Sequence, residues 1–451
     1  MTAPHILTRP EHGVSRKNIN PDALKVLYRL KNSGHLVYLV GGGVRDLLLG
    51  RRPKDFDIGT DAHPHEVKKL FRNCYVIGRR FRLCHVRFGQ HIVEVSTFRR
   101  KSEAAEGDPL IRHDNTFGTP EEDAFRRDFT VNALFYDIAS FSVIDYVDGL
   151  KDLRDHVIRT IGDPDVRFRE DPVRMLRAVA LGTRLGFRIA DTTLEAIRAL
   201  RGEIVKSSPA RLLEEIYKIL RQGAATATMV RLHETGLLAY LMPEADAVFR
   251  SDPTELLASL AQLDIYRNAG RSAPEDLSNP LIMGALLVPL GLTARRRSRP
   301  SPTGAPPDEA AEGQGDGEET AKGEDPEEEE VPADSDAIVP LSLPFARRDL
   351  DRLRLMLAAQ RRLHDLRHPQ HTRRVLARRH YFPDALRWAE MQGGEEGRAL
   401  ADTWRRLSHE PERATTAPES PGDGGGSSRR RSRRRRGRRR RGPRPSPPAE
   451  G

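Results

Sequence analysis

The sequence has 451 residues, of which 31% are charged, and its formal net charge is +10. Only 37% are hydrophobic, below the ~45–50% usual for soluble globular domains. No run approaches the ~18 uninterrupted apolar residues of a membrane span, and the N-terminus lacks the apolar core of a secretory signal. Two cysteines, Cys74 and Cys84, are too few for a disulfide framework or a cysteine-rich zinc site. We therefore expect a cytoplasmic protein without membrane contact.

The hydrophobic deficit is concentrated in two segments. Residues 308–336 carry fourteen acidic residues and one lysine, whereas residues 411–451 carry thirteen arginines and four acidic residues. The remaining chain keeps a net charge of about +14 and is long enough for two or three domains. A basic chain of this kind favours a polyanion as partner, although solubility alone is the simpler explanation.

The first 160 residues alternate strand-like and helical patterns after a flexible leader at residues 1–20. The apolar periodicity predicts helices at 21–31 and 64–71, and strands at 36–40, 56–58, 85–88, 92–97, 129–136 and 143–147. Such alternation is typical of one α/β domain, so we expect a catalytic head over residues 21–160.

The pattern becomes helical after residue 160. We expect a helical neck at 161–225, a helical body at 226–296 and a helical C-terminal region at 339–410. The acidic, Pro- and Gly-rich residues 297–338 are typical of a disordered insertion, and the arginine-rich residues 411–451 of a disordered tail. The expected fold class is α+β, with a mixed sheet followed by an all-α region.

Three glycines, Gly41, Gly42 and Gly43, directly follow the strand predicted at 36–40. A glycine turn between a strand and a helix lets the backbone approach a phosphate closely. A dinucleotide-binding turn would need glycine where Asp46 stands, and no Gly-Lys-Ser/Thr follows as in a Walker A motif. The turn therefore predicts phosphate binding of another type.

Two carboxylates, Asp55 and Asp57, flank the apolar Phe56. Residues i and i+2 of a strand point to the same face, so the two carboxylates repel each other unless a cation lies between them. Mg²⁺, with Mn²⁺ as its substitute, suits hard oxygen ligands completed by substrate phosphates. The pair is typical of two-metal nucleotidyl transfer, whereas a solvated Asp-x-Asp turn is the plain alternative.

A third acid is expected near this pair. Glu94 is a polar residue in a run of strand apolars, and burying its carboxylate without a partner would cost ~2–7 kcal/mol, so we expect a metal ion or an arginine beside it. Asp128 is the other candidate. Either residue could instead be a plain ion-pair partner.

Five blocks in order and spacing resemble the class II tRNA nucleotidyltransferase and bacterial poly(A) polymerase family. They are residues 41–57, 127–133, 145–159, 170–178 and 210–216. The resemblance implies a head like that of DNA polymerase beta, followed by a helical neck, body and tail. It also implies that Asp55 and Asp57 hold Mg²⁺ and that Asp128 is a further acid of the active site.

The same resemblance implies which residues contact the nucleotide. They are Gly42, Gly43, Arg45, Arg127, Asp171, Arg174 and Arg177. This chain departs from the family at Ala180 and Leu181, where we expect arginine and phenylalanine. A phosphate contact from that helical turn is therefore not expected here.

Asp171 and Arg174 form the base-reading pair of the family. They are i and i+3 at a helix start, so both project to one side. A carboxylate accepts from an exocyclic amine and a guanidinium donates to a ring nitrogen, which suits adenine and cytosine but not guanine or uracil. The plain alternative is that Asp171 caps the helix and Arg174 is a surface charge.

This pair leaves two activities open, because adenine and cytosine present the same pattern. Residues 76–86 and the leader 12–40 resemble the poly(A)-adding members, and the arginine-rich tail suits non-specific RNA binding. We therefore expect template-independent transfer of AMP from ATP to RNA 3′ ends, which would promote RNA decay. The alternatives are a CCA-adding enzyme and a non-catalytic RNA-binding protein on the same scaffold.

Overall fold

The fold was described from a computed structural model, which covers residues 3–78, 83–100, 116–270, 277–291, 342–367 and 369–409. The chain divides into two units after Ser408, and the fold below is that of the first. The expected insertion at 297–338 and tail at 411–451 lie outside the described residues. Within those residues, no helix is long and apolar enough to cross a membrane.

Eight strands of the described residues form one mixed sheet in the order β1-β8-β7-β2-β3-β6-β5-β4. All neighbouring strands are antiparallel except β3 and β6, which are parallel. The strands are β1 (His5–Leu7), β2 (Val37–Val40), β3 (Asp57–Thr60), β4 (Cys74–Ile77), β5 (Leu83–Phe88), β6 (His91–Thr97), β7 (Leu134–Asp137) and β8 (Ser142–Asp145).

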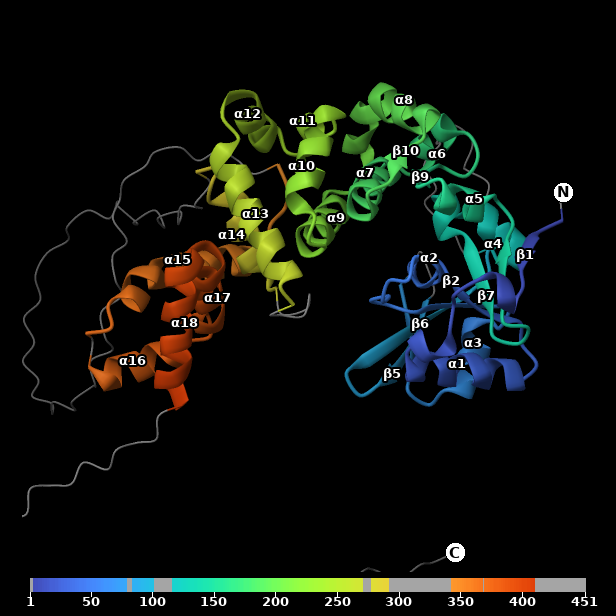
Figure 1. Cartoon of the computed structure of the whole chain (residues 1–451), viewed down its shortest axis with the longest axis horizontal. Coiled ribbons are helices and arrows are strands. Elements are labelled where there is room, and N and C mark those ends of the chain that lie inside the picture. The colour runs from blue at the N-terminus through green and yellow to red at the C-terminus, as the bar shows by residue number, and fades with distance from the viewer. Residues whose placement is uncertain are drawn as a thin grey trace, which may run out of the picture. The chain divides into compact units, whose positions relative to one another are not determined.

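Helices α1 (Pro21–Asn32) and α3 (Pro64–Leu70) lie side by side against the sheet (Figure 1). The Asn20 side chain begins α1 by accepting a hydrogen bond from the Asp22 amide at 2.7 Å, and Pro21 stands in the first turn. Ala23, Val26, Leu27 and Leu30 are buried at i, i+3, i+4 and i+7. The helix predicted at 21–31 is therefore confirmed.

The strand predicted at 129–136 is wrong in its first half. A 3₁₀ turn, η3 (Thr130–Asn132), precedes β7, because local side-chain bonds compete with the strand ladder there. Asp128 accepts hydrogen bonds from the Phe129 amide at 2.8 Å and from the Asn132 side chain at 3.2 Å. Helix α2 (Gly42–Leu48) and helix α4 (Pro120–Arg126) both precede this turn in the sequence.

After α5 (Gly149–Arg154) the described chain is mostly helical, apart from a short parallel pair of strands, β9 (Val157–Ile158) and β10 (Arg188–Ile189). The expected fold class, a mixed sheet followed by a mostly helical region, is confirmed. The helices are α6 (Pro164–Glu170), α7 (Val173–Leu185), α8 (Asp191–Leu200), α9 (Pro209–Arg221), α10 (Ala225–Glu234), α11 (Leu238–Leu241), α12 (Pro243–Ser251), α13 (Thr254–Asn268), α14 (Asn279–Leu287), α15 (Arg347–His364), α16 (Gln370–Ala377), α17 (Phe382–Gln392) and α18 (Gly394–His409).

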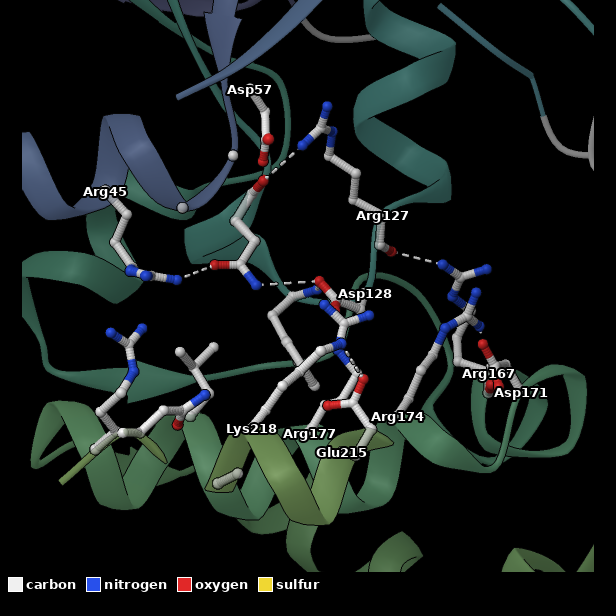
Figure 2. Close-up of a pocket in the computed structure, with 18 of the residues that line it drawn as sticks. Arg45, Asp57, Arg127, Asp128, Arg167, Asp171, Arg174, Arg177, Glu215 and Lys218 are labelled. Atoms are coloured by element: carbon white, nitrogen blue, oxygen red, sulfur yellow. Dashed lines mark hydrogen bonds and ion pairs between the residues drawn. The ribbon is translucent and has the colours of Figure 1, made fainter. Parts of the chain in front are cut away.

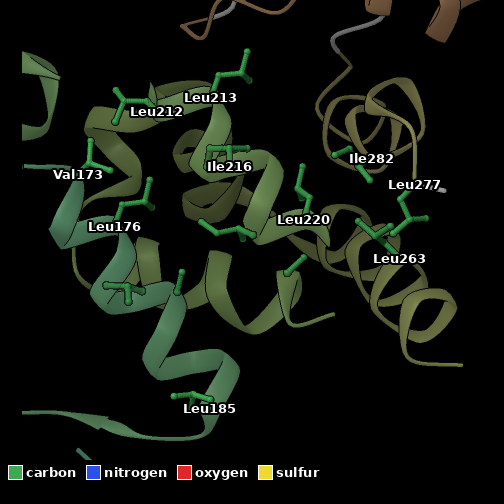
Figure 3. Close-up of a cluster of buried hydrophobic side chains, with 14 of the residues drawn as sticks. Val173, Leu176, Leu185, Leu212, Leu213, Ile216, Leu220, Leu263, Leu277 and Ile282 are labelled. Carbon is green, nitrogen blue, oxygen red and sulfur yellow. The ribbon is translucent and has the colours of Figure 1, made fainter. Parts of the chain in front are cut away.

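Helices α7 and α9 share a hydrophobic core with α13 and α14 (Figure 3). Leu176 of α7 faces the core together with Leu212, Ile216 and Leu220 of α9, all of them buried. The apolar positions of α9 recur at i, i+4 and i+8, so its opposite face remains polar. This packing holds α7 and α9 together and fixes the direction in which their charged side chains project.

Candidate functional site

A cavity of about 560 Å³ lies between the head and helices α7 and α9 (Figure 2). Among its described lining residues, nine are arginine or lysine and four are acidic. The cations are Arg45, Arg126, Arg127, Arg167, Arg174, Arg177, Arg184, Arg211 and Lys218, and the acids are Asp57, Asp128, Asp171 and Glu215. This imbalance suits a ligand that carries several negative charges.

The glycine turn forms one wall of the cavity. Gly41 has a φ of +74°, which favours glycine, and a Cβ there would lie 3.1 Å from the Arg127 guanidinium. Gly42 lines the cavity beside Arg45. Gly43 does not line it, and a Cβ there would lie 3.3 Å from the Asp55 carbonyl oxygen. Gly43 therefore serves the close packing of α2 on the segment before β3.

The predicted carboxylates gather at the same end of β3. Asp57 is the first residue of β3 and lines the cavity, whereas Asp55 lies in the preceding loop and is exposed. The register that pairs Ile58 with Val95 places Glu94 beside Asp57. Burial, followed by the charge of Glu94, raises the pKa of Asp57 to about 6, and the charge of Asp55 adds to this against the opposing Arg127.

This donor set fits a divalent cation. Glu94 and Asp55 each repel Asp57, and hard oxygen ligands are those that Mg²⁺ prefers. Among the described residues, no group of three or more His, Cys, Asp and Glu side chains is arranged as a complete metal site. A bound cation would therefore need oxygen ligands from the substrate as well, as is usual for Mg²⁺ bound with phosphates.

The expected burial of Glu94 is wrong. Its side chain is 48% exposed, and His85 Nε2 lies 3.5 Å from its Oε1. Alternation along β6 showed that Glu94 and its buried neighbours Val93 and Val95 face opposite sides. It did not show that the side of Glu94 is open.

Asp128 is buried and already has partners. Besides the two hydrogen bonds within its own turn, it forms an ion pair with Arg177 at 2.9 Å. Burial alone would raise its pKa, but Arg177 and these bonds prevail and lower it. Asp128 thus remains ionised and joins the turn before β7 to α7.

Arg127 is held in place before any ligand binds. Its Nε and Nη2 donate to the buried carboxylate of Asp123 at 3.0 and 2.9 Å, and its Nη1 donates to the Asn132 carbonyl oxygen at 3.2 Å. Burial would raise the pKa of Asp123, but the charges of Arg127 and Arg126 prevail and lower it. Figure 2 shows the side chains of Arg127 and Asp57 on the same side of the cavity.

Arg45 is fixed in a similar way. Its Nε donates to Asp46 Oδ1 at 2.8 Å, and its Nη1 donates to Asn132 Oδ1. Asn132 therefore connects the two arginines that lie beside the glycine turn.

Asp171 and Arg174, the predicted base-reading pair, both line the cavity. Arg211 donates to both carboxylate oxygens of Asp171, at 3.1 and 3.0 Å. Arg174 donates to the Arg167 carbonyl oxygen at 2.9 Å and pairs with Glu170 at 3.3 Å. The alternative of Asp171 as a helix cap is wrong, because no side chain caps α7.

Ala180 and Leu181 stand where the family resemblance led us to expect arginine and phenylalanine, but α7 carries an arginine one turn later. Both residues line the cavity, and so does Arg184, which lies 4.0 Å from Asp46. Burial, followed by the charge of Arg45, lowers the pKa of Arg184. A cation therefore remains on this side of α7.

Five cations of the cavity were not predicted as site residues from the sequence, namely Arg126, Arg167, Arg184, Arg211 and Lys218. Arg211, Glu215, Lys218 and Gln222 all line the cavity and recur at i, i+4, i+7 and i+11, the period of one helix face. The polar stripe of α9, opposite its apolar stripe, was the signal that could have identified Arg211 and Lys218.

Two family models match the chain. Residues 37–159 match the poly A polymerase head domain, and residues 186–249 match the model described as "Probable RNA and SrmB- binding site of polymerase A". The first covers the turn at Gly41 and all three clustered carboxylates.

Curated relatives show the same similarity. Poly(A) polymerase I of Salmonella typhi is 46% identical over 295 residues, which are 63% of this chain and 63% of that protein. Poly(A) polymerase I of Escherichia coli O157:H7 is 45% identical over 308 residues, 66% of each. The CCA-adding enzyme of Lactobacillus helveticus is 41% identical over 199 residues, 44% of this chain and 49% of that protein. The chain thus matches somewhat less than two thirds of the length of these polymerases.

A solved structure supports the fold. The crystal structure of the Bacillus stearothermophilus CCA-adding enzyme in complex with CTP matches with a TM-score of 0.56 and 26% identity. The match covers 86% of this chain and 82% of that one.

Proposed function

Because this chain belongs to the class II tRNA nucleotidyltransferase and poly(A) polymerase family, we propose that it transfers AMP from ATP to RNA 3′ ends without a template and releases pyrophosphate. One observation carries the proposal. Asp57, with Glu94 beside it, opens onto the same cavity as the clamped arginines of the head and the base-reading pair of the neck. RNA and ATP are the partners that this site would bring together.

Asp55, Asp57 and Glu94 would hold Mg²⁺, or Mn²⁺ in its place, which when bound lowers the pKa of an attacking 3′-hydroxyl and neutralises phosphate charge. We assign Glu94 rather than Asp128 as the third acid of this site, because Glu94 acts on Asp57 while Asp128 is paired with Arg177.

Arg45 and Arg127 would bind the phosphates and sugar of ATP. Asp46, Asp123 and Asn132 hold the two guanidinium groups in place, so little reorganisation accompanies binding. Fixed donors stabilise charge that develops during the reaction better than mobile ones do.

Asp171 and Arg174 would read the base. A carboxylate has about four lone-pair sites, and Arg211 uses two of those on Asp171, so Asp171 can still accept from an exocyclic amine. Arg174 keeps donors beyond the Nη1 that binds Arg167 and Glu170. Guanine would leave the remaining lone pairs of Asp171 and the remaining donors of Arg174 without a partner on the base, and an unsatisfied buried group costs ~1–3 kcal/mol.

Adenylation is favoured over CCA addition by the relatives. The polymerases named above are similar over a longer part of this chain than the CCA-adding enzyme. The resemblance of residues 76–86 to the poly(A)-adding members also favours adenylation, although residues 79–82 lie outside the described part. CCA addition remains the alternative activity, and RNA binding without catalysis is disfavoured by the retained carboxylates.

The test uses the full-length protein, an RNA primer, Mg²⁺ and each nucleoside triphosphate separately. We expect a long ladder with ATP alone. Two or three additions that require CTP would establish the alternative, and RNA binding without incorporation would refute catalysis. The variant with both Asp55→Ala and Asp57→Ala, purified in parallel, should be inactive and controls for a contaminating polymerase.

A further inference from the structure

Among the residues that the structure describes, no helix covers one face of the sheet where β4, β5 and β6 lie side by side; we call it the open face. The other face carries Cys84 and Val86, which are buried, and α3 covers it, with the Cys84 thiol 3.7 Å from the Pro64 carbonyl oxygen. Side chains alternate between the two faces, so the open face carries Tyr75 and Ile92. Tyr75 is 59% exposed and Ile92 is 50% exposed.

A row of side chains crosses this open face. Tyr75 pairs with His85, His85 pairs with Glu94, and the β3–β6 register places Asp57 beside Glu94. We call these four residues the cross-strand row. With strands ~4.8 Å apart, the row extends roughly 14 Å from Asp57 to Tyr75. It therefore begins at the proposed metal site and ends at an exposed aromatic ring.

The chemistry around the row suits a single-stranded nucleic acid. Exposed Ile77 lies two residues from Tyr75 along β4. Exposed Ile92 lies on the same face on β6, where it pairs with the exposed cation Arg87. Surfaces of this type stack bases on aromatic rings and bind the backbone with cations. Continuity with the carboxylates favours RNA over a second protein chain, because an RNA strand must present its 3′-hydroxyl at Asp57.

We propose that the open face of β4–β6 binds the nucleotides that precede the 3′ end of the RNA, with a base stacked on Tyr75 and an apolar contact from Ile92. The proposal rests on the proposed function, since it takes the 3′ end to lie at Asp57. It adds a binding surface on the head that is distinct from the cavity lined by α2, α7 and α9.

The test compares Tyr75→Ala and Ile92→Ala with two controls, Tyr75→Phe, which keeps the ring, and Ile265→Ala, a matched exposed isoleucine on α13. Tyr75→Ala should raise the KM for oligoadenylate primers by about 5- to 100-fold, the range of a lost base stack. Ile92→Ala should raise it less, and both controls should match the wild type. The KM for ATP and kcat should not change.

Primer length gives a second readout. A primer of two nucleotides ends short of Tyr75, so the wild type and Tyr75→Ala should extend it equally and diverge only on longer primers. A 4-thiouridine placed upstream of the 3′ end should crosslink to β4 or β5. An active wild type whose Tyr75→Ala variant keeps its KM for long primers would overturn this inference while leaving the proposed function intact.

Two further outcomes would also overturn it. Equal losses in Tyr75→Ala and Ile265→Ala would show that the effect is not specific to the open face. A shift of Tyr75→Ala from dimer to monomer in sedimentation would assign the face to a second copy of the chain. Absence of incorporation by the wild type would instead refute the proposed function itself.

Discussion

At the scale of single residues, burial and the neighbouring carboxylates make the ionised form of Asp57 unfavourable. Its pKa is raised to about 6 from 3.8, first by burial and then by the charge of Glu94. A carboxyl group whose pKa is raised on folding binds its proton more tightly in the folded state. The metal-free protein therefore gains stability as the pH falls from above 6 towards 3.8, and Mg²⁺ must displace a bound proton below about pH 6.

We predict that Mg²⁺ binding to the protein without nucleotide weakens below about pH 6, approaching tenfold per pH unit for the one proton that is displaced. Titration calorimetry between about pH 5 and pH 8 measures this. Asp57→Asn should bind Mg²⁺ poorly at every pH and should be more stable than the metal-free wild type at pH 8. A wild-type affinity that does not change across this range would contradict the prediction.

Among residues, those of local motifs could be predicted and those of long-range contacts could not. The family resemblance of the segments around Asp57, Arg127 and Arg174 led us to expect them at one site, and all three line the cavity. Arg211 meets Asp171 across 40 positions of sequence, a contact that no local pattern encodes. Alternation along β6 placed Glu94 on one face but could not tell which face the helices cover.

At the scale of elements, α4 serves to place one buried carboxylate. Thr119 and Pro120 begin the helix, with a capping box in which Thr119 and Glu122 bond each other's amides at 2.8 and 3.2 Å. One turn later Asp123 is 1% exposed and binds Arg126 and Arg127. Arg127 directly follows α4, so the helix fixes the direction of the Arg127 side chain through the ion pair with Asp123.

We predict that Asp123→Asn lowers kcat/KM for ATP by about tenfold or more, because charged hydrogen bonds contribute ~1.5–3 kcal/mol and Arg127 would lose its partner. The melting temperature should also fall, since two guanidinium groups lose a buried counter-charge. Asp351→Asn, which removes an exposed ion pair on α15, is the control and should change neither quantity. Unchanged steady-state kinetics for Asp123→Asn would show that Arg127 does not need this clamp.

Elements with strong periodicity were predicted well. The helical pattern expected within 161–225 includes α9 (Pro209–Arg221), whose apolar stripe is complete and which Ser208 caps. The strand expected from residue 129 was wrong in its first half. There the Asp128 carboxylate accepts hydrogen bonds from the Phe129 amide and the Asn132 side chain, and these local bonds compete with pairing to a neighbouring strand. The strand propensity of the apolar residues in this segment does not reveal that such local hydrogen bonds will form.

At the scale of the whole molecule, a few long-range pairs connect the head with the helices after it. Arg167 donates to the carbonyl oxygens of Arg126 and Arg127 at 2.6 and 2.5 Å, and Arg51 donates to the Leu185 carbonyl oxygen at 3.3 Å. Together with the Asp128–Arg177 pair, these contacts place the cavity between the two parts. Composition predicts where domains begin and end, but it does not predict which residues of one domain contact the next.

The arginine-rich segment belongs to the same scale, because the charge of so long a segment would act on a bound RNA as a whole. Twelve arginines lie between residues 429 and 444, with no aromatic residue among them. The segment can therefore neutralise phosphates, but it has no aromatic ring to stack on bases and cannot read sequence. We predict that truncation after Glu419 leaves kcat at saturating RNA nearly unchanged, since every cavity residue is retained. Apparent RNA affinity should fall by similar factors for unrelated RNA sequences.

The salt dependence of binding tests this directly. For single-stranded RNA, the slope of log affinity against log salt is about −0.7 per neutralised phosphate, so truncation should make it shallower by about 0.7 for each phosphate that the segment neutralises in the full-length protein. A variant with all twelve arginines replaced by lysine keeps the charge and should retain most of the full-length slope, whereas a glutamine variant of equal length should match the truncation. Overlapping slopes for the full-length and truncated proteins on two RNAs would show that this segment does not bind RNA.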